Sequence, residues 1–453
     1  MTIVAFFDRA NSIAKPGFNR WLVPPAALCI HLCIGEAYAF SVFTKPMAQA
    51  IGVTAPLPGV DWSVPQLGWI FSLAIAILGL SAAFGGKWVE RAGPRAAMFL
   101  AASCFSLGLF VAALGVNWHL LWLVYLGYGA IGGCGLGIGY ISPVSTLIKW
   151  FPDRPGLATG TAIMGFGGGA LIGAPLSVLL MKHFANTAGT GVAQTMAVLG
   201  VIYFIWMCVG SLIVRLPPDG WRPAGYVPSA SSQGMITNKN VVLESALRTP
   251  QFYLLWAVLC LNVTAGIGVL GQASLMIQEM FGVTAIAAAG FVGLLSIFNM
   301  GGRIFWASLS DFIGRKTTYA IFFILGAVLY FVVPTFGHMQ ALALFVLAFC
   351  VILSMYGGGF STIPAYLRDL YGTVNVGAIH GALLTAWSAA GVAGPVLINY
   401  IRQYQIDHGV AKADAYSITM YIMAALLVVG LLCNLAVRPV HERHHLEATP
   451  AQL

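Results

Sequence analysis

The chain has 453 residues, of which 59% are hydrophobic and only 8% are charged, and its formal net charge is +8. A soluble domain is about 45–50% apolar and about 25% charged, so this chain has too few charged side chains to cover a soluble surface of its size. The composition therefore argues against soluble enzymes, nucleic-acid-binding proteins and disordered chains.

Twelve segments are long and apolar enough to cross a membrane, which takes about 20 mostly apolar residues in a helix. Lipid cannot satisfy backbone hydrogen bonds, so only helices and closed barrels span it, and these segments are too long for barrel strands. The sequence therefore predicts an all-α membrane protein with twelve transmembrane helices. In chain order the segments are 21–43, 64–84, 96–115, 120–144, 156–181, 194–214, 251–276, 286–308, 317–336, 340–363, 376–400 and 416–437.

Lys and Arg are distributed unevenly over the connections between these segments. If the N-terminus is cytoplasmic, 17 of the 22 Lys and Arg residues lie on the cytoplasmic side and four lie outside, with Arg303 inside a segment. Cytoplasmic loops of membrane proteins are enriched in Lys and Arg, so both termini are predicted to be cytoplasmic. The same asymmetry accounts for the net charge without a nucleic-acid partner, and the short loops suit a bacterial inner membrane.

One long cytoplasmic connection, residues 216–250, is rich in Pro and Gly and contains the run from Ser231 to Gly234. This composition is typical of a linker. The sequence thus predicts an N-terminal six-helix half at 1–215, a linker at 216–250, a C-terminal six-helix half at 251–437 and a cytoplasmic tail at 438–453.

The two halves also repeat each other at a nearly constant spacing. Three matches occur at shifts of 221, 221 and 220 positions: Glu90-x-x-Gly93 with Asp311-x-x-Gly314, Pro143 with Pro364, and Gly173-Ala174-Pro175 with Ala393-Gly394-Pro395. Two parallel six-helix repeats are the architecture of secondary transporters of the major facilitator type. The sequence therefore predicts two pseudo-symmetric six-helix bundles.

Several stretches carry a resemblance to known families. The loop from Gly86 to Arg95 and its repeat from Leu309 to Lys316 resemble the signature loops of the major facilitator superfamily. Residues 149–160 and 362–395 are similar to the oxalate/formate antiporter family, a relative of the monocarboxylate transporters. The resemblance covers essentially all twelve segments, and it implies alternating access to a substrate site between the halves.

Arg303 is the first candidate for substrate binding. It follows Ser296 and Asn299 at spacings that place the three polar side chains on one helical face, and charged residues within membrane segments are costly and therefore functional candidates. The planar guanidinium can bind a carboxylate through two parallel hydrogen bonds, a bidentate arrangement. The alternative is that Arg303 merely reaches toward the cytoplasmic surface. The resemblance implies that Arg303 aligns with the family's substrate-binding arginine and that Asn299 takes part four positions earlier.

The segment 376–400 departs from the resemblance. The oxalate/formate antiporter has a cavity lysine after a Thr-Ala stretch, whereas here Leu384-Thr385-Ala386 is followed by Trp387. Two cations suit a dianion and one suits a monoanion, so the sequence predicts a monocarboxylate substrate, unless Trp387 only packs and another cation compensates. His380 lies seven residues before Trp387 and shares its face of a regular helix, about 10 Å away. It is either a group that titrates near physiological pH or a hydrogen-bonded core residue.

Glu36 is the only carboxylate deep within a segment. It is a candidate for taking up a co-transported proton, and the alternative is a hydrogen bond that ties its helix to a neighbour. On a regular helix Glu36 and Tyr38 lie about 200° apart, whereas His31 and Tyr38 share a face. The resemblance matches the stretch from Tyr38 to Phe43 to an aromatic-rich part of the family's substrate site, so Tyr38 is favoured for substrate.

Two further tyrosines and two lines of glycines belong to the predicted core. Tyr140 and Tyr356 are candidate hydrogen-bond donors to the carboxylate, since each resembles a family cavity tyrosine.

The glycine-rich stretches lack the Gly-Lys-Ser/Thr ending of a phosphate loop. Glycines spaced by four let helices approach and slide, and they form two lines: Gly129, Gly133 and Gly137, and Gly165, Gly169 and Gly173.

Charged residues in the two signature loops are candidates for a cytoplasmic gate: Glu90, Arg91, Arg95, Asp311 and Arg315. Their ion pairs would hold the halves closed on that side, although the same positive charges also serve topology. The tail from His441 to His445 is read as a solvated terminus rather than a metal site.

The leading hypothesis is a secondary active transporter of small monocarboxylates such as lactate, pyruvate or formate, driven by a proton or by exchange. It needs no cofactor and is expected to work as a monomer. An oxalate/formate-type dicarboxylate antiporter is the alternative within this class, and a carboxylate-binding membrane sensor is the alternative from another class. A membrane enzyme is disfavoured because the segments lack paired catalytic carboxylates and clustered His, and no ATP-binding motif indicates a pump.

Overall fold

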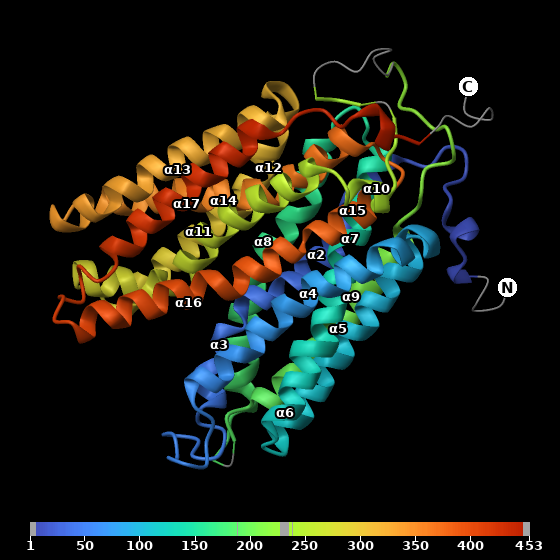
Figure 1. The fold of residues 1–453 in the computed structure, drawn as a ribbon. Helices are drawn as coiled ribbons and strands as arrows, with labels where there is room; N and C mark the ends of the chain where they lie inside the picture. Colours follow the sequence, from blue (N-terminus) through green and yellow to red (C-terminus); the bar gives the residue numbers. More distant parts are fainter. Residues whose placement is uncertain (1–5, 188, 227–234, 238, 447–453) are drawn as a thin grey trace. The chain divides into compact units, whose positions relative to one another are not determined.

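A computed structural model describes residues 6–187, 189–226, 235–237 and 239–446. The described residues form helices joined by turns and loops, and twelve of the helical segments are long and apolar enough to cross a membrane (Figure 1). The prediction of a twelve-helix all-α membrane protein is confirmed.

The chain divides into two compact units. Unit 1 comprises Met1–Trp150 and Thr161–Trp221, and unit 2 comprises Phe151–Gly160 and Arg222–Leu453. The division passes through helix α8 (Pro155–Phe184), whose first turn and a half packs with unit 2. The predicted limits of halves, linker and tail stay a prediction, and the run Ser231 to Gly234 and residues 447–453 of the tail lie outside the described residues.

Unit 1 contains helices of regular and irregular winding. Proline stands in the first turn of several of them, where no backbone N–H is needed. The elements are α2 (Val23–Ile34), η3 (Gly35–Ala39), α3 (Ser41–Met47), α4 (Val64–Ala92), α5 (Pro94–Asn117), α6 (Leu121–Val124), η4 (Tyr125–Gly132), α7 (Gly133–Trp150), most of α8, and α9 (Val192–Ile213). The η3 stretch is a 3₁₀-helix and η4 is a π-helix, and both lie within membrane-spanning segments.

Unit 2 holds the remaining six spanning segments. Its elements are α10 (Leu243–Ala246), α11 (Pro250–Phe281), α12 (Ala285–Ile313), α13 (Arg315–His338), α14 (Leu342–Tyr371), α15 (Val376–Leu383), α16 (Thr385–Asp407), α17 (Ser417–Ala436) and the short η5 (Glu442–His444). The segment predicted at 376–400 is two helices, because the α-helical course is interrupted at Leu384.

The internal repeat is visible in backbone conformation. Gly93 and Gly314 end α4 and α12 at φ +84° and +83°, a left-handed conformation that favours glycine. Pro143 lies inside α7 and Pro364 lies inside α14. Equivalent positions of the two repeats therefore have equivalent local structure.

The two lines of glycines mark close helix contacts, as predicted. A Cβ atom at Gly169 of α8 would lie 2.5 Å from the Gly35 carbonyl carbon and the Leu32 oxygen. A Cβ at Gly133 would lie 2.8 Å from Ile77 of α4 and 2.9 Å from the Ala74 oxygen. These glycines let α8 approach the first spanning segment and α7 approach α4 at backbone distance.

Candidate functional site

Arg303 is enclosed by unit 2. It lies on α12 with 0% of its surface exposed, which contradicts the alternative that its side chain reaches to the membrane surface. Its Nε donates a hydrogen bond to Asn299 Oδ1 at 3.3 Å, across one helical turn. The hydroxyl of Ser361 on α14 donates to the Arg303 carbonyl at 2.7 Å. The predicted polar face of α12 is thus turned toward α14.

Phe360 on α14 connects the predicted residues of unit 2. Its ring centroid lies 5.2 Å from the guanidinium carbon of Arg303, 4.5 Å from the Trp387 ring and 5.2 Å from the Tyr356 ring. An arginine over an aromatic face is stabilised by the ring quadrupole. Phe360 was not among the predicted site residues, because a phenylalanine in an apolar helix gives no signal beyond its position one turn after Tyr356.

His380 and Trp387 lie on the two sides of Leu384, where α15 passes into α16 within one membrane-spanning segment. Trp387 belongs to α16 and His380 to α15, and both are buried. The Trp256 indole donates to the Thr385 hydroxyl at 2.9 Å and so attaches the start of α16 to α11. The backbone of Leu384 keeps a right-handed helical conformation between the two helices, so the expectation that His380 and Trp387 share one face stays a prediction.

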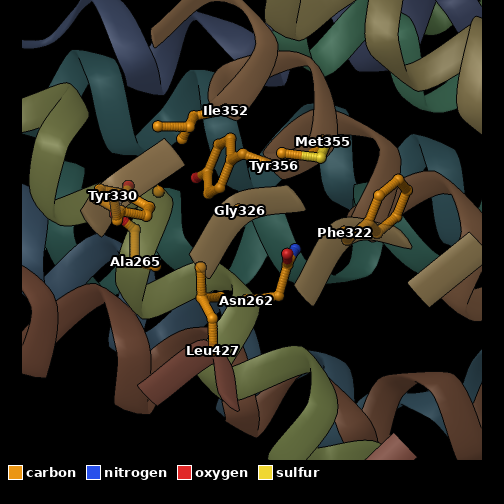
Figure 2. A pocket seen from close by; sticks show the side chains of 10 residues that line it. Asn262, Ala265, Phe322, Gly326, Tyr330, Ile352, Met355, Tyr356 and Leu427 are labelled. Atoms are coloured by element: carbon orange, nitrogen blue, oxygen red, sulfur yellow. Dashed lines mark hydrogen bonds between the residues drawn. The ribbon is translucent and has the colours of Figure 1, made fainter. Parts of the chain in front are cut away.

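Tyr356 also borders a small cavity within unit 2, which Figure 2 shows together with Asn262 and Tyr330. The cavity volume is about 10 Å³, which is room for about one water molecule. It is too small for a carboxylate, so this cavity is not a substrate pocket.

In unit 1 the candidate tyrosines belong to an aromatic cluster formed by His31, Tyr38, Tyr140 and Phe166. Phe166 on α8 contacts Tyr38 on η3 and Tyr140 on α7, with ring centroids 5.0 and 5.5 Å apart. The His31 ring on α2 lies 5.4 Å from the Tyr140 ring. His31 and Tyr38 therefore face the same cluster, as predicted. Phe166 was not selected, yet it precedes Trp387 by 221 positions, the shift of the internal repeat.

Glu36 points away from this cluster. Its stretch is a 3₁₀-helix, so the assumption of a regular α-helix is wrong, and Glu36 and Tyr38 lie about 240° apart at three residues per turn. Glu36 is fully buried, and the Tyr128 hydroxyl on η4 donates to its Oε2 at 3.1 Å. The structure thus contains the hydrogen bond to a neighbouring helix that was the alternative role for Glu36, while proton uptake stays a prediction.

The gate candidates of unit 1 make contacts inside that unit. Glu90 at the end of α4 pairs with Lys149 of α7 and accepts a 2.7 Å hydrogen bond from the Ser145 hydroxyl. Arg95 donates to the Phe6 carbonyl at 2.9 Å, and its guanidinium carbon lies 4.7 Å from the Phe6 ring centroid. Arg91 is exposed.

Asp311 in unit 2 accepts hydrogen bonds from the start of α8. Both carboxylate oxygens accept hydrogen bonds of 2.9 Å, one from the Gly156 backbone N–H and one from that of Leu157. Arg315 pairs with Asp311 at 2.5 Å and with Asp369 of α14 at 3.2 Å. A carboxylate at a helix N-terminus is stabilised by the unpaired N–H groups and the helix dipole. The signature loop of unit 2 therefore holds the first turn of α8.

Comparison with known proteins adds the family. Residues 26–395 match the sequence profile described as the Major Facilitator Superfamily. The chain belongs to this superfamily. It is 26% identical to the oxalate:formate antiporter of Oxalobacter formigenes over 377 residues, 83% of each chain. It is 25% identical to monocarboxylate transporter 11 of Homo sapiens, over 84% of this chain and 77% of that one.

Solved structures of other members have the same fold. The proton:xylose symporter XylE, bound to 6-bromo-6-deoxy-D-glucose, superposes with a TM-score of 0.67 at 14% identity, over 94% of this chain and 95% of that one. The predicted resemblance to the oxalate/formate and monocarboxylate transporters is confirmed. This member of the major facilitator superfamily is a multi-pass membrane transporter of a small substrate and not an enzyme.

Proposed function

We propose that this transporter moves small monocarboxylates, such as lactate, pyruvate or formate, by alternating access. Arg303 carries the proposal: it is a fully buried cation within a spanning helix, oriented by Asn299 and lying over Phe360. A charged side chain within a spanning helix is by default a candidate for function, and the guanidinium fork matches a carboxylate. The names of the two relatives, an oxalate:formate antiporter and a monocarboxylate transporter, support an organic anion.

Each unit supplies a proposed set of substrate-binding side chains. Unit 2 supplies Arg303 and Asn299, with Tyr356, Trp387 and His380 nearby in the same bundle, and unit 1 supplies Tyr38 and Tyr140. The tyrosine hydroxyls donate hydrogen bonds to the carboxylate. The choice of a monoanion rests on Trp387, which stands where the oxalate/formate family has a second cation.

Energy for uphill transport comes from a proton or from exchange against another carboxylate, and Glu36 is one candidate for the proton. The residues Glu90, Arg91, Arg95, Asp311 and Arg315 act as a cytoplasmic gate. Arg315 and its partners Asp311 and Asp369 are largely buried, so their pairing is more costly to break than an exposed ion pair, which contributes about 0–1 kcal/mol. A substrate shifts the two states of such a gate only by its difference in affinity for them. We place the transporter, as a monomer, in a bacterial inner membrane.

Uptake into proteoliposomes tests the function. Labelled lactate, pyruvate, formate and oxalate are supplied with and without a pH gradient, and protein-free vesicles give the background. We expect saturable uptake or exchange of at least one monocarboxylate. Carboxylate binding without any uptake or exchange would instead favour the membrane sensor, and would refute the transporter for carboxylates.

The variant Trp387→Lys separates a monoanion site from a dianion site. It adds a cation beside Phe360, whose ring contacts both Trp387 and Arg303 in the wild type. We expect oxalate to compete better against labelled lactate in this variant than in the wild type. Unchanged competition by oxalate would contradict the inference that a single cation selects a monoanion. Strong oxalate transport by the wild type would establish the dicarboxylate antiporter instead.

A further inference from the structure

The ring of His31 makes an unusual pair of contacts. Its Nδ1 lies 2.7 Å from the backbone oxygen of Ala162 on α8, and its Nε2 lies 3.2 Å from the backbone oxygen of Tyr140 on α7. The side chain is fully buried. Both distances fall within the range of N–H···O hydrogen bonds.

A carbonyl oxygen only accepts hydrogen bonds, so the number of ring protons decides how many of these contacts are favourable. A neutral imidazole has one N–H donor and one acceptor nitrogen, whereas the imidazolium has two donors. In the neutral ring, the shorter contact to Ala162 takes the donor and the Nε2 lone pair then faces the Tyr140 oxygen. Only the doubly protonated ring donates to both carbonyls.

Several described groups of unit 1 lie around His31. Facing it are Tyr140 from α7, a neutral phenol, and the backbone at Ala162 and Gly165 from α8; the Cβ of His31 lies 3.0 Å from a Cβ built at Gly165. Glu36, on the same span, is five residues on and about 140° or more around the helix, where it accepts from Tyr128. Cys29, Cys33 and Tyr38 are further titratable residues along the segment, and Tyr38 contacts Phe166 in the same cluster. The α9 helix packs on another side of α2, where Gly210 meets Ala26 and Cys29.

We propose that His31 is the residue that binds and releases the coupled proton, an inference that rests on the proposed carboxylate transport. The second proton adds a hydrogen bond between α2 and the carbonyl of Tyr140, and its loss removes that bond. The side chain of Tyr140 is also the phenol that is proposed to bind the substrate carboxylate. Proton binding and substrate binding therefore act on one position of α7, which is the physical basis of a coupling free energy between them.

Two substitutions at His31 each keep one donor and remove the titration. Asn places its amide nitrogen near the position of Nδ1, opposite Ala162, and Gln places its nitrogen near that of Nε2, opposite Tyr140. Neither amide takes up a proton, whereas a neutral imidazole ring can. The matched control is His183→Asn, an exposed histidine in the last turn of α8.

Transport in proteoliposomes gives the first readout. With an inward proton gradient, the wild type and the His183→Asn control accumulate the labelled monocarboxylate. We expect His31→Asn and His31→Gln to lose this accumulation while they still exchange labelled for unlabelled substrate without a gradient. Accumulation that persists in both variants overturns the proposal, and so does its loss in Glu36→Gln alone. Wild-type exchange without any gradient-driven accumulation overturns it as well, but leaves carboxylate transport standing.

Nuclear magnetic resonance of ¹⁵N-labelled histidine gives a second readout that needs no transport. The His31 ring signals are identified as those absent from His31→Asn. We expect the ring to be an imidazolium at the lower pH of the gradient that drives accumulation and neutral at the higher pH. A ring that is neutral at both pH values overturns the proposal, even if the carrier moves carboxylates. A ring that titrates in a protein that moves none shows that the proposed function, not the protonation of His31, has failed.

Discussion

Arg303 is the residue on which the proposed chemistry depends. Its charge was evident from the sequence as the one cation among 22 that lies inside a spanning segment. What could not be read there is how it is held: Asn299 lies one turn earlier on its own helix, but Phe360 is 57 positions away along the chain on α14. Apolar residues give no sequence signal for a role beside a charge, so the aromatic contact emerged only from the fold.

We expect Arg303→Lys to weaken carboxylate transport strongly, although it keeps the positive charge. Lysine offers a point charge instead of a planar fork and loses at least one charge-assisted hydrogen bond, worth about 2 kcal/mol or about thirtyfold in affinity. The measurement is the concentration dependence of labelled uptake in proteoliposomes. Arg222→Lys, at an exposed arginine, is the matched control, and wild-type uptake by Arg303→Lys would reject the role of Arg303.

At the scale of elements, irregular turns bring polar side chains into place. Glu36 and Tyr38 lie on the 3₁₀ stretch η3, Tyr128 lies on the π-helix η4, and the winding changes at Leu384 between His380 and Trp387. Hydropathy predicted a continuous helix at each of these places, because the apolar character of a segment does not depend on its winding. The winding is a property of the backbone conformation at these residues, which hydropathy does not report.

The approach of α8 to the first spanning segment depends on glycine. In Gly169→Ala the new methyl group would lie 2.5 Å from two backbone atoms of residues 32 and 35, so backbone must move at a cost of about 1–3 kcal/mol. We expect a lower midpoint of thermal unfolding in detergent. Gly293→Ala on α12, where a Cβ meets no atom within 4 Å, is the control and should not lower the midpoint. Equal midpoints for the two variants would contradict the close packing.

The contact of Asp311 with the start of α8 is a second element-scale feature. Asp311→Asn keeps an oxygen for the backbone N–H groups but loses the charge that pairs with Arg315. We expect a loss of about 1–3 kcal/mol, seen as a lower midpoint of thermal unfolding. The control is Asp219→Asn at an exposed aspartate of the 216–250 segment. If both variants unfold at the same temperature, Asp311 does not hold α8.

At the scale of the whole molecule, the distribution of charge predicts the orientation in the membrane. With 17 Lys and Arg on one side and four on the other, both termini are expected in the cytoplasm. A fluorescent protein that matures only in the cytoplasm, fused after residue 453, should fluoresce. Alkaline phosphatase, active only outside, should be active when inserted in the exposed turn at residues 408–412. The opposite pattern of the two reporters would show the reverse orientation.

The sequence by itself determined the twelve spanning helices, the repeat of two bundles and the candidate cation Arg303. These follow from properties that each segment has on its own, because lipid selects apolar length and penalises every buried charge locally. Only the tertiary structure decided which groups meet. The two carbonyls at the His31 ring lie 131 and 109 positions away in the chain, and Tyr128 lies 92 positions from Glu36. Such contacts depend on how helices pack and where their winding changes, and neither hydropathy nor charge carries that information.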